Sequence, residues 1–192
     1  MRVPRILLAA GASGSGKTLI TCGLLQVMQN RKIKTASFKC GPDYIDPMFH
    51  SKVIGTKSRN LDTFFAGEPV VRYLLEKNME GMELAVMEGV MGYYDGVGGT
   101  TTQASAYDLA RVTETPVILI VNAKGMSVSL AAYVKGFLGY RKDSQIRGVI
   151  FNQMSPMLYP RMKRLVEEEL GIHVYGYVPK VEDCQIESRH LG

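Results

Sequence analysis

The stretch GASGSGKT, residues 11–18, decides the fold of this chain. It matches the phosphate-binding pattern G-x-x-x-x-G-K-[ST] in full, and an apolar run, Ile6–Ala10, precedes it. Glycines let a backbone wrap tightly enough for its N–H groups to point at phosphate oxygens. The helix expected next, Lys17–Asn30, presents its positive end to the same place. The stretch therefore predicts a strand, a phosphate-binding loop and a helix in succession.

The loop residues divide into backbone donors and two side chains with separate tasks. We expect Lys17 to reach the β- and γ-phosphates of ATP, and the Thr18 hydroxyl to bind Mg²⁺. The residues expected to surround the nucleotide phosphates are Gly11, Ser13, Gly14, Ser15, Gly16, Lys17 and Thr18. Partitioning and septum-placing ATPases usually carry a second lysine early in this loop. Here the position is Ala12, which weakens that relationship.

Outside the loop, apolar runs alternate with helical stretches. The expected strands are Ile6–Ala10, Thr35–Cys40, Leu84–Glu88, Val117–Asn122, Val149–Asn152 and Val174–Val178. The expected helices are Lys17–Asn30, Pro69–Asn78, Ser105–Val112, Ser127–Leu138 and Pro160–Leu170. This alternation predicts an α/β fold with a doubly wound, mostly parallel sheet flanked by helices, which binds ligands at the carboxyl ends of its strands. Gly41–Leu61 and Gly89–Gln103 show no clear period, so we expect long irregular loops there, which are either functional or disordered.

Composition restricts the class of protein further. A length of 192 residues suits one α/β domain. The net charge of +5 is scattered, with no run of five like charges, so we expect no nucleic-acid partner. No segment approaches the roughly 18 apolar residues of a spanning helix, so we expect no membrane association. Three cysteines without a close pair, and three histidines far apart, argue against disulfides and zinc and favour the cytoplasm.

Acidic residues at strand ends are candidates for the metal that accompanies a nucleotide. Glu88 ends an apolar run and occupies the position of a Walker-B-like acid, although an acid can also simply end a strand. Asp43 and Asp46 stand three apart in KCGPDYIDP, residues 39–47. Two carboxylates held together repel, so their proximity favours a cation between them, with an ordinary Asp-Pro turn as the alternative. Asp95, in GYYDG, is a turn signal first.

The motifs together resemble a known family. Gly11–Thr18, FKCGPDYIDPMFH at 38–50 and EGVMGYYDG at 88–96 are similar to the N-terminal domain of cobyrinic acid a,c-diamide synthases. Ser105–Ala110 and Glu187–Gly192 also fit, and dethiobiotin synthetase is a more distant relative with the same P-loop fold. The resemblance implies that residues 1–192 are one ATP-binding amidoligase (synthetase) domain. It also implies a missing C-terminal glutamine amidotransferase domain that supplies ammonia, so we expect a part of a longer protein.

The resemblance further implies a reaction and roles for residues. A peripheral carboxylate of cobyrinic acid would be activated by MgATP as an acyl phosphate and then amidated by ammonia. The candidate catalytic residues are Lys17, Asp43, Asp46, Glu88 and Asp95, and the candidate metal ligands are Thr18, Asp43, Asp46 and Glu88. Tyr44 and Asp95 would face the tetrapyrrole. Lys39 would receive its carboxylate or be a solvated lysine. Asn152 would contact adenine or only form a turn.

Several alternatives stay open from the sequence. The substrate could be another tetrapyrrole, such as nickel-sirohydrochlorin, or the chain could be a cobyric acid synthase. A partitioning-type ATPase switch is an alternative of a different class, although Ala12 speaks against it. A homodimer is likewise left open.

Overall fold

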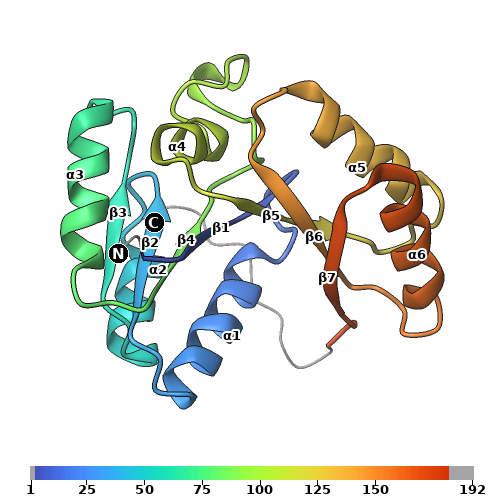
Figure 1. Cartoon of the computed structure of the whole chain (residues 1–192), viewed down its shortest axis with the longest axis horizontal. Coiled ribbons are helices and arrows are strands. Elements are labelled where there is room, and N and C mark those ends of the chain that lie inside the picture. The colour runs from blue at the N-terminus through green and yellow to red at the C-terminus, as the bar shows by residue number, and fades with distance from the viewer. Residues whose placement is uncertain (1–2, 182–192) are drawn as a thin grey trace.

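One fully parallel sheet of seven strands organises the computed structural model, which describes residues 3–181 (Figure 1). The strand order is β3-β2-β4-β1-β5-β6-β7. The strands are β1 Arg5–Ala10, β2 Thr35–Cys40, β3 Ser58–Leu61, β4 Leu84–Glu88, β5 Val117–Asn122, β6 Ile146–Asn152 and β7 His173–Val178. The order reverses between β1 and β5, so the α/β doubly wound sheet expected from the sequence is confirmed.

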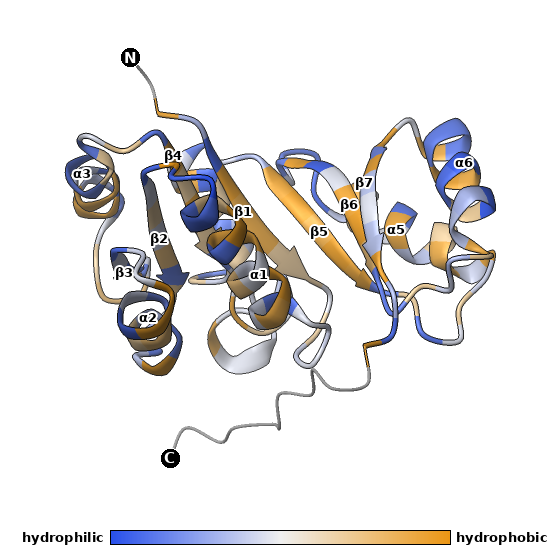
Figure 2. Ribbon diagram, turned by 90° about the horizontal axis from the view of Figure 1, so that it is seen from below, coloured by the Kyte–Doolittle hydropathy of each residue, from blue (hydrophilic) through white to orange (hydrophobic). Residues whose placement is uncertain are grey.

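Helices cover both faces of this sheet. They are α1 Lys17–Asn30, α2 Ile45–Phe49, α3 Glu68–Met79, α4 Ala106–Thr113, α5 Ser129–Tyr140 and α6 Tyr159–Leu170. Two short turns, η1 His50–Ile54 and η2 Val97–Gly99, are π-helical and 3₁₀ respectively. Leu8 and Ala10 of β1 pack with Leu25 of α1 on one face, whereas Leu7 and Ala9 point into the larger core beneath α3 to α6. Figure 2 shows β5 and β6 as apolar strands, whereas α6 is largely hydrophilic.

One sequence expectation about a loop is wrong. Gly41–Leu61 is not irregular, because it contains α2, η1 and the edge strand β3. The sequence pattern does not predict β3, because only its ends, Ser58 and Leu61, are buried, while Arg59 and Asn60 are exposed. An edge strand pairs on one side only, so it lacks the doubly apolar pattern of the inner strands. The stretch Gly89–Gln103 is irregular as expected, apart from η2.

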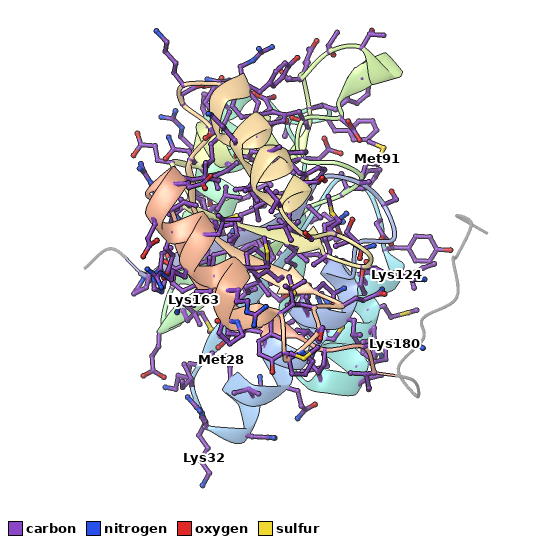
Figure 3. The ribbon with its side chains drawn as sticks, turned by 90° about the vertical axis from the view of Figure 1, so that its right-hand side faces the viewer. Met28, Lys32, Met91, Lys124, Lys163 and Lys180 are labelled. Atoms are coloured by element: carbon purple, nitrogen blue, oxygen red, sulfur yellow. The ribbon has the colours of Figure 1, made fainter. Side chains whose placement is uncertain are left out.

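Surface charge is dispersed over the described part of the chain. Lys32, Lys124, Lys163 and Lys180 lie at separate places on the molecule (Figure 3). None of the helices described between residues 3 and 181 is long and apolar enough to cross a membrane. The family-like ending, Glu187–Gly192, lies outside the described residues, as do Cys184 and His190.

Candidate functional site

The phosphate loop lies between the carboxyl end of β1 and the first turn of α1 (Figure 1). Gly14 and Gly16 adopt left-handed backbone angles, with φ of 72° and 94°. L-residues with a side chain seldom adopt such angles. A Cβ on Gly16 would also lie 2.2 Å from the Asn152 amide nitrogen. The loop therefore needs glycine at position 16 both for its conformation and for the space that Asn152 occupies.

Lys17 connects the phosphate loop to the segment that follows β4. Its ammonium donates hydrogen bonds to the carbonyl oxygens of Ala12, at 3.1 Å, and Met91, at 2.5 Å. Burial, reinforced by the charge of Lys39, lowers the pKa of Lys17 to about 8, against the raising effects of Glu88 and Asp95. A phosphate group offers stronger, charge-assisted acceptors than these two carbonyls. The geometry therefore suits an ammonium that exchanges backbone acceptors for an anionic ligand.

Lys39 stands at the centre of the acidic residues that the sequence singled out. Its ammonium lies 2.7 Å from Asp46 Oδ2, 2.8 Å from Glu88 Oε1 and 3.9 Å from Asp43 Oδ2. Lys39 and Glu88 are register partners on β2 and β4, which explains why side chains 49 residues apart meet. The cation between the two aspartates of this structure is thus the chain's own lysine. The alternative of a solvated Lys39 is wrong, because its side chain is only 5% exposed.

Glu88 joins this cluster to the phosphate loop. The Thr18 hydroxyl donates to Glu88 Oε1 at 2.6 Å, and the Glu88 side chain is fully buried. Burial raises the pKa of Glu88, although Lys39 opposes the shift. Burial likewise lowers the pKa of Lys39, but Glu88 and Asp46 outweigh burial and leave it above its ordinary value. The raised pKa of Lys39 follows from one ammonium placed among more than one carboxylate, whereas that of Glu88 follows mainly from burial.

The donor atoms at this place suit Mg²⁺ chemically. Hydroxyl and carboxylate oxygens are the donors that Mg²⁺ prefers, and Thr18, Asp46 and Glu88 supply them. Glu88 Oε2 is buried without a hydrogen-bond partner, so the cluster has unused acceptor capacity. Within residues 3–181, no group of three or more His, Cys, Asp or Glu side chains is arranged to hold a metal ion. The acids instead surround Lys39, so a bound metal would compete with its ammonium.

Asp95 and Tyr44 lie at the edges of this cluster. Asp95 Oδ2 accepts the Gly92 N–H at 2.9 Å, and its charge raises the pKa of Lys17. Asp95 therefore acts electrostatically on the phosphate loop as well as facing outward. Tyr44, the residue after Asp43, is 62% exposed. Their roles toward a second substrate stay predictions.

Asn152 supports the phosphate loop through a hydrogen bond to its backbone. Its side chain is buried at the end of β6 and donates to the Ser15 carbonyl at 2.9 Å, across 137 residues of sequence. Its Oδ1 accepts the Gln153 N–H at 3.0 Å. The sequence suggested an adenine contact or a turn, and the contact to the loop backbone is an additional role. The adenine contact stays a prediction.

Replacing Asn152 by alanine is expected to weaken ATP binding about tenfold, because the Ser15 carbonyl loses a buried donor and the loop loses its support. Calorimetric titration with ATP measures the change. Asn122 provides a matched control, since it ends the neighbouring strand β5 but only accepts the Lys124 N–H at 3.2 Å. Equal ATP affinity in Asn152→Ala, Asn122→Ala and the unsubstituted chain would refute the support role.

His50 and Ser37 are site residues that sequence reasoning missed. His50 is fully buried, and burial lowers the pKa of its imidazole, despite an opposing effect of Asp46. Its Nδ1 lies 2.9 Å from Ser37 Oγ, and its Nε2 lies 3.6 Å from Glu88 Oε2. A usable signal was present, because His50 stands four residues after Asp46, which places both on one side of a helical turn.

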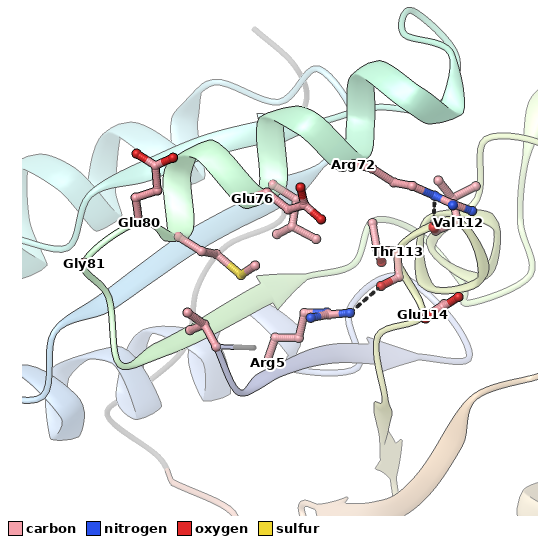
Figure 4. A pocket seen from close by; sticks show the side chains of 11 residues that line it. Arg5, Arg72, Glu76, Glu80, Gly81, Val112, Thr113 and Glu114 are labelled. Carbon is pink, nitrogen blue, oxygen red and sulfur yellow. Dashed lines mark hydrogen bonds between the residues drawn. The ribbon is translucent and has the colours of Figure 1, made fainter. Parts of the chain in front are cut away.

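A separate cavity of about 440 Å³ lies at the opposite, amino end of β1 (Figure 4). Here Arg5 donates to the Thr113 carbonyl and Arg72 to the Val112 carbonyl, each at 2.8 Å. Both carbonyls belong to the last turn of α4, which has no further helical donors to offer them. The two arginines therefore cap a helix and have a structural task.

The sheet order and the loop with its Lys17, Thr18 and Glu88 define a P-loop nucleotide-binding protein. Residues 6–191 match the family model CbiA, described as the CobQ/CobB/MinD/ParA nucleotide binding domain. The chain belongs to this family.

Two similar proteins carry the name cobyrinate a,c-diamide synthase. The chain is 42% identical to that of Thermoplasma acidophilum over 100% of its own length, and 44% identical to that of Saccharolobus solfataricus over 98%. It spans 43% and 42% of those relatives, respectively. Among solved structures, chloroplast FtsY from Physcomitrella patens superimposes with a TM-score of 0.69 at 12% identity, covering 94% of this chain and 60% of that one. That likeness confirms the P-loop NTPase fold alone.

Proposed function

We propose that this chain is the ATP-binding synthetase part of a cobyrinate a,c-diamide synthase. It would activate the a and c side-chain carboxylates of cobyrinic acid as acyl phosphates, which ammonia converts to amides. The observation that carries the proposal is the contact of Thr18, in the phosphate loop, with Glu88, which is paired with Lys39. This contact brings a nucleotide site and a buried cation for a substrate carboxylate together. The names of relatives about 40% identical supply the substrate.

The chemical obstacle is the approach of two anions. Two unit charges 4 Å apart repel by about 4 kcal/mol at an effective dielectric constant of 20. Lys17 and the loop N–H groups would offset this repulsion at the γ-phosphate, most strongly as charge spreads in the transition state. Thr18, Asp43, Asp46 and Glu88 would hold Mg²⁺, which when bound neutralises phosphate charge. No side chain of this set has to form a covalent bond to substrate.

Lys39 would change its partner during the reaction. A cation held by Asp46 and Glu88 weakens their attraction for the Lys39 ammonium, which lies between them. The Lys39 ammonium could then form an ion pair with an incoming substrate carboxylate. Tyr44 and Asp95, which are both exposed, would face the tetrapyrrole.

The nitrogen would come from elsewhere in a longer protein. The chain spans less than half of its named relatives, and none of its cysteines stands in a G-x-C-x-G elbow. We infer that residues 1–192 are one synthetase domain and that a C-terminal glutaminase domain releases ammonia from glutamine. The sparse cysteines favour a reducing, cytoplasmic setting.

The test is amidation of cobyrinic acid by the 192-residue chain with MgATP. Free ammonia, at a pH that leaves part of it unprotonated, is expected to give mono- and diamide by mass spectrometry together with ADP. Glutamine as the only nitrogen source is expected to give none. Nickel-sirohydrochlorin in place of cobyrinic acid tests the substrate, and Lys17→Ala is the inactive control. Release of glutamate from glutamine, or faster amidation of nickel-sirohydrochlorin, would contradict the proposal.

A further inference from the structure

The second carboxylate oxygen of Glu88 has no hydrogen-bond partner, whereas the first has two. Oε1 accepts from the Thr18 hydroxyl and the Lys39 ammonium. Oε2 is buried and faces His50 Nε2, which is itself buried without a hydrogen-bond partner, at 3.6 Å. Two unpartnered polar atoms so close together are unusual, because buried polar groups are almost always satisfied. The pair therefore calls for a functional explanation.

Two serine side chains, Ser58 and Ser37, connect the edge strand to this pair. Ser58 Oγ on β3 donates to Ser37 Oγ on β2 at 3.4 Å, and Ser37 Oγ lies 2.9 Å from His50 Nδ1. A hydroxyl that accepts the Ser58 hydrogen keeps its own hydrogen for another acceptor. Ser37 can then donate to His50 Nδ1. A neutral imidazole that accepts at Nδ1 carries its hydrogen on Nε2, the atom that faces Glu88.

The opposite tautomer would place two lone pairs against each other. With the hydrogen on Nδ1, both His50 Nε2 and Glu88 Oε2 would be acceptors at 3.6 Å. With the hydrogen on Nε2, an approach of roughly half an ångström would bring the two atoms to hydrogen-bond length. Hydrogen bonds of this kind are often long before ligands bind and tighten afterwards.

We propose that His50 is a positioning residue for Glu88, held by Ser37 as the Nε2–H tautomer so that it donates to Glu88 Oε2. A donor on Oε2 fixes the plane of the carboxylate and keeps Oε1 directed at Thr18. The chain from Ser58 to Glu88 thus couples the edge strand to the phosphate loop. The inference rests on the proposed function only in that Glu88 serves the magnesium of MgATP.

Two measurements test this proposal. Long-range proton–nitrogen NMR of the nucleotide-free chain reports which ring nitrogen of His50 carries hydrogen. His50→Gln identifies the His50 signals by their loss, and His173→Gln, at an exposed histidine, confirms the assignment. The second measurement is ATP affinity with and without Mg²⁺ for the unsubstituted chain, His50→Gln and His50→Leu. Glutamine keeps an N–H near the position of Nε2, whereas leucine keeps only the volume.

Hydrogen on Nε2 is the expected NMR result. The gain in ATP affinity from Mg²⁺ is expected to fall at least tenfold in His50→Leu, because removing a partner of a metal ligand costs about 10- to 100-fold in metal affinity. In His50→Gln it should stay within about threefold of the unsubstituted chain, which is well below that roughly 10- to 100-fold loss. Metal-free ATP affinity should be unchanged in both variants.

Three results would overturn the proposal: hydrogen on Nδ1, an unchanged magnesium effect in His50→Leu, or a loss in His50→Gln as large as in His50→Leu. If His50→Leu does not fold, the NMR result and the magnesium effect in His50→Gln still test the proposal. A folded, unsubstituted chain that gains no ATP affinity from Mg²⁺ would refute the proposed function, while the tautomer measurement would stand unaffected.

Discussion

Replacing Lys17 by alanine is expected to lower ATP turnover by about 10²- to 10³-fold, the cost of losing one strong donor to the charge that develops in a transition state. Lys17 is the residue whose ammonium reaches from the phosphate loop to the segment after β4. ATP hydrolysis with cobyrinic acid and ammonia measures turnover, and calorimetry measures affinity. If both quantities equal those of the unsubstituted chain, the assignment of the phosphate site is wrong.

The pH dependence of ATP affinity provides a second readout of the same residue. The pKa of Lys17 is about 8 in the nucleotide-free protein, so the ammonium loses its proton as pH rises through 8. Only the protonated form attracts phosphate, and a bound phosphate raises the pKa, so ATP affinity should fall above pH 8. Lys17→Ala should lack this fall. A profile of the unsubstituted chain that is flat between pH 7 and about 9.5 would contradict the expectation.

Removing Lys39 alone is expected to destabilise the chain by about 3 kcal/mol, because the buried Glu88 and Asp46 carboxylates lose their counter-charge. Removing Glu88 alone is expected to cost less, because Asp46 still pairs with the Lys39 ammonium. The double variant Glu88→Leu/Lys39→Met should cost less than the sum of the two, with a coupling of about 2 kcal/mol. Asp46 limits the recovery, since it loses the Lys39 ammonium in the double variant. Urea unfolding monitored by circular dichroism measures the three free energies.

An ion pair on the surface provides the control for this double-mutant cycle. Arg164 and Glu168 are paired at 2.8 Å on α6, but both side chains are more than half exposed. The corresponding cycle there should show a coupling of at most about 0.5 kcal/mol. All Glu88 and Lys39 variants should lose ATP-dependent amidation, including the double variant that regains stability. If the stability changes of the two single variants add up to that of the double variant, the contact between Glu88 and Lys39 contributes nothing to stability.

Local sequence patterns were sufficient to predict the longer helices and every strand of the sheet except the edge strand β3. The helix expected at Lys17–Asn30 and the strands expected at Thr35–Cys40, Leu84–Glu88 and Val117–Asn122 have the bounds that the structure shows. Each signal is carried by neighbouring residues: a glycine loop that leads into a helix, or an apolar run buried on both faces. The phosphate loop was predictable for the same reason, because all of its functional atoms come from eight consecutive residues.

The partners of the acidic residues required the tertiary structure. Periodicity reports whether a residue is buried, but it does not report which strands are neighbours. The order β2-β4-β1 places Lys39 beside Glu88, and so puts the chain's own ammonium where the sequence suggested a metal or a simple Asp-Pro turn. Asn152 reaches Ser15 across the sheet for the same reason. The P-loop, six of the seven strands and the acidic candidates can all be predicted from the amino-acid sequence. Strand order and side-chain packing place Lys39 among these acids and His50 opposite Glu88, because those contacts join residues that are distant in the chain.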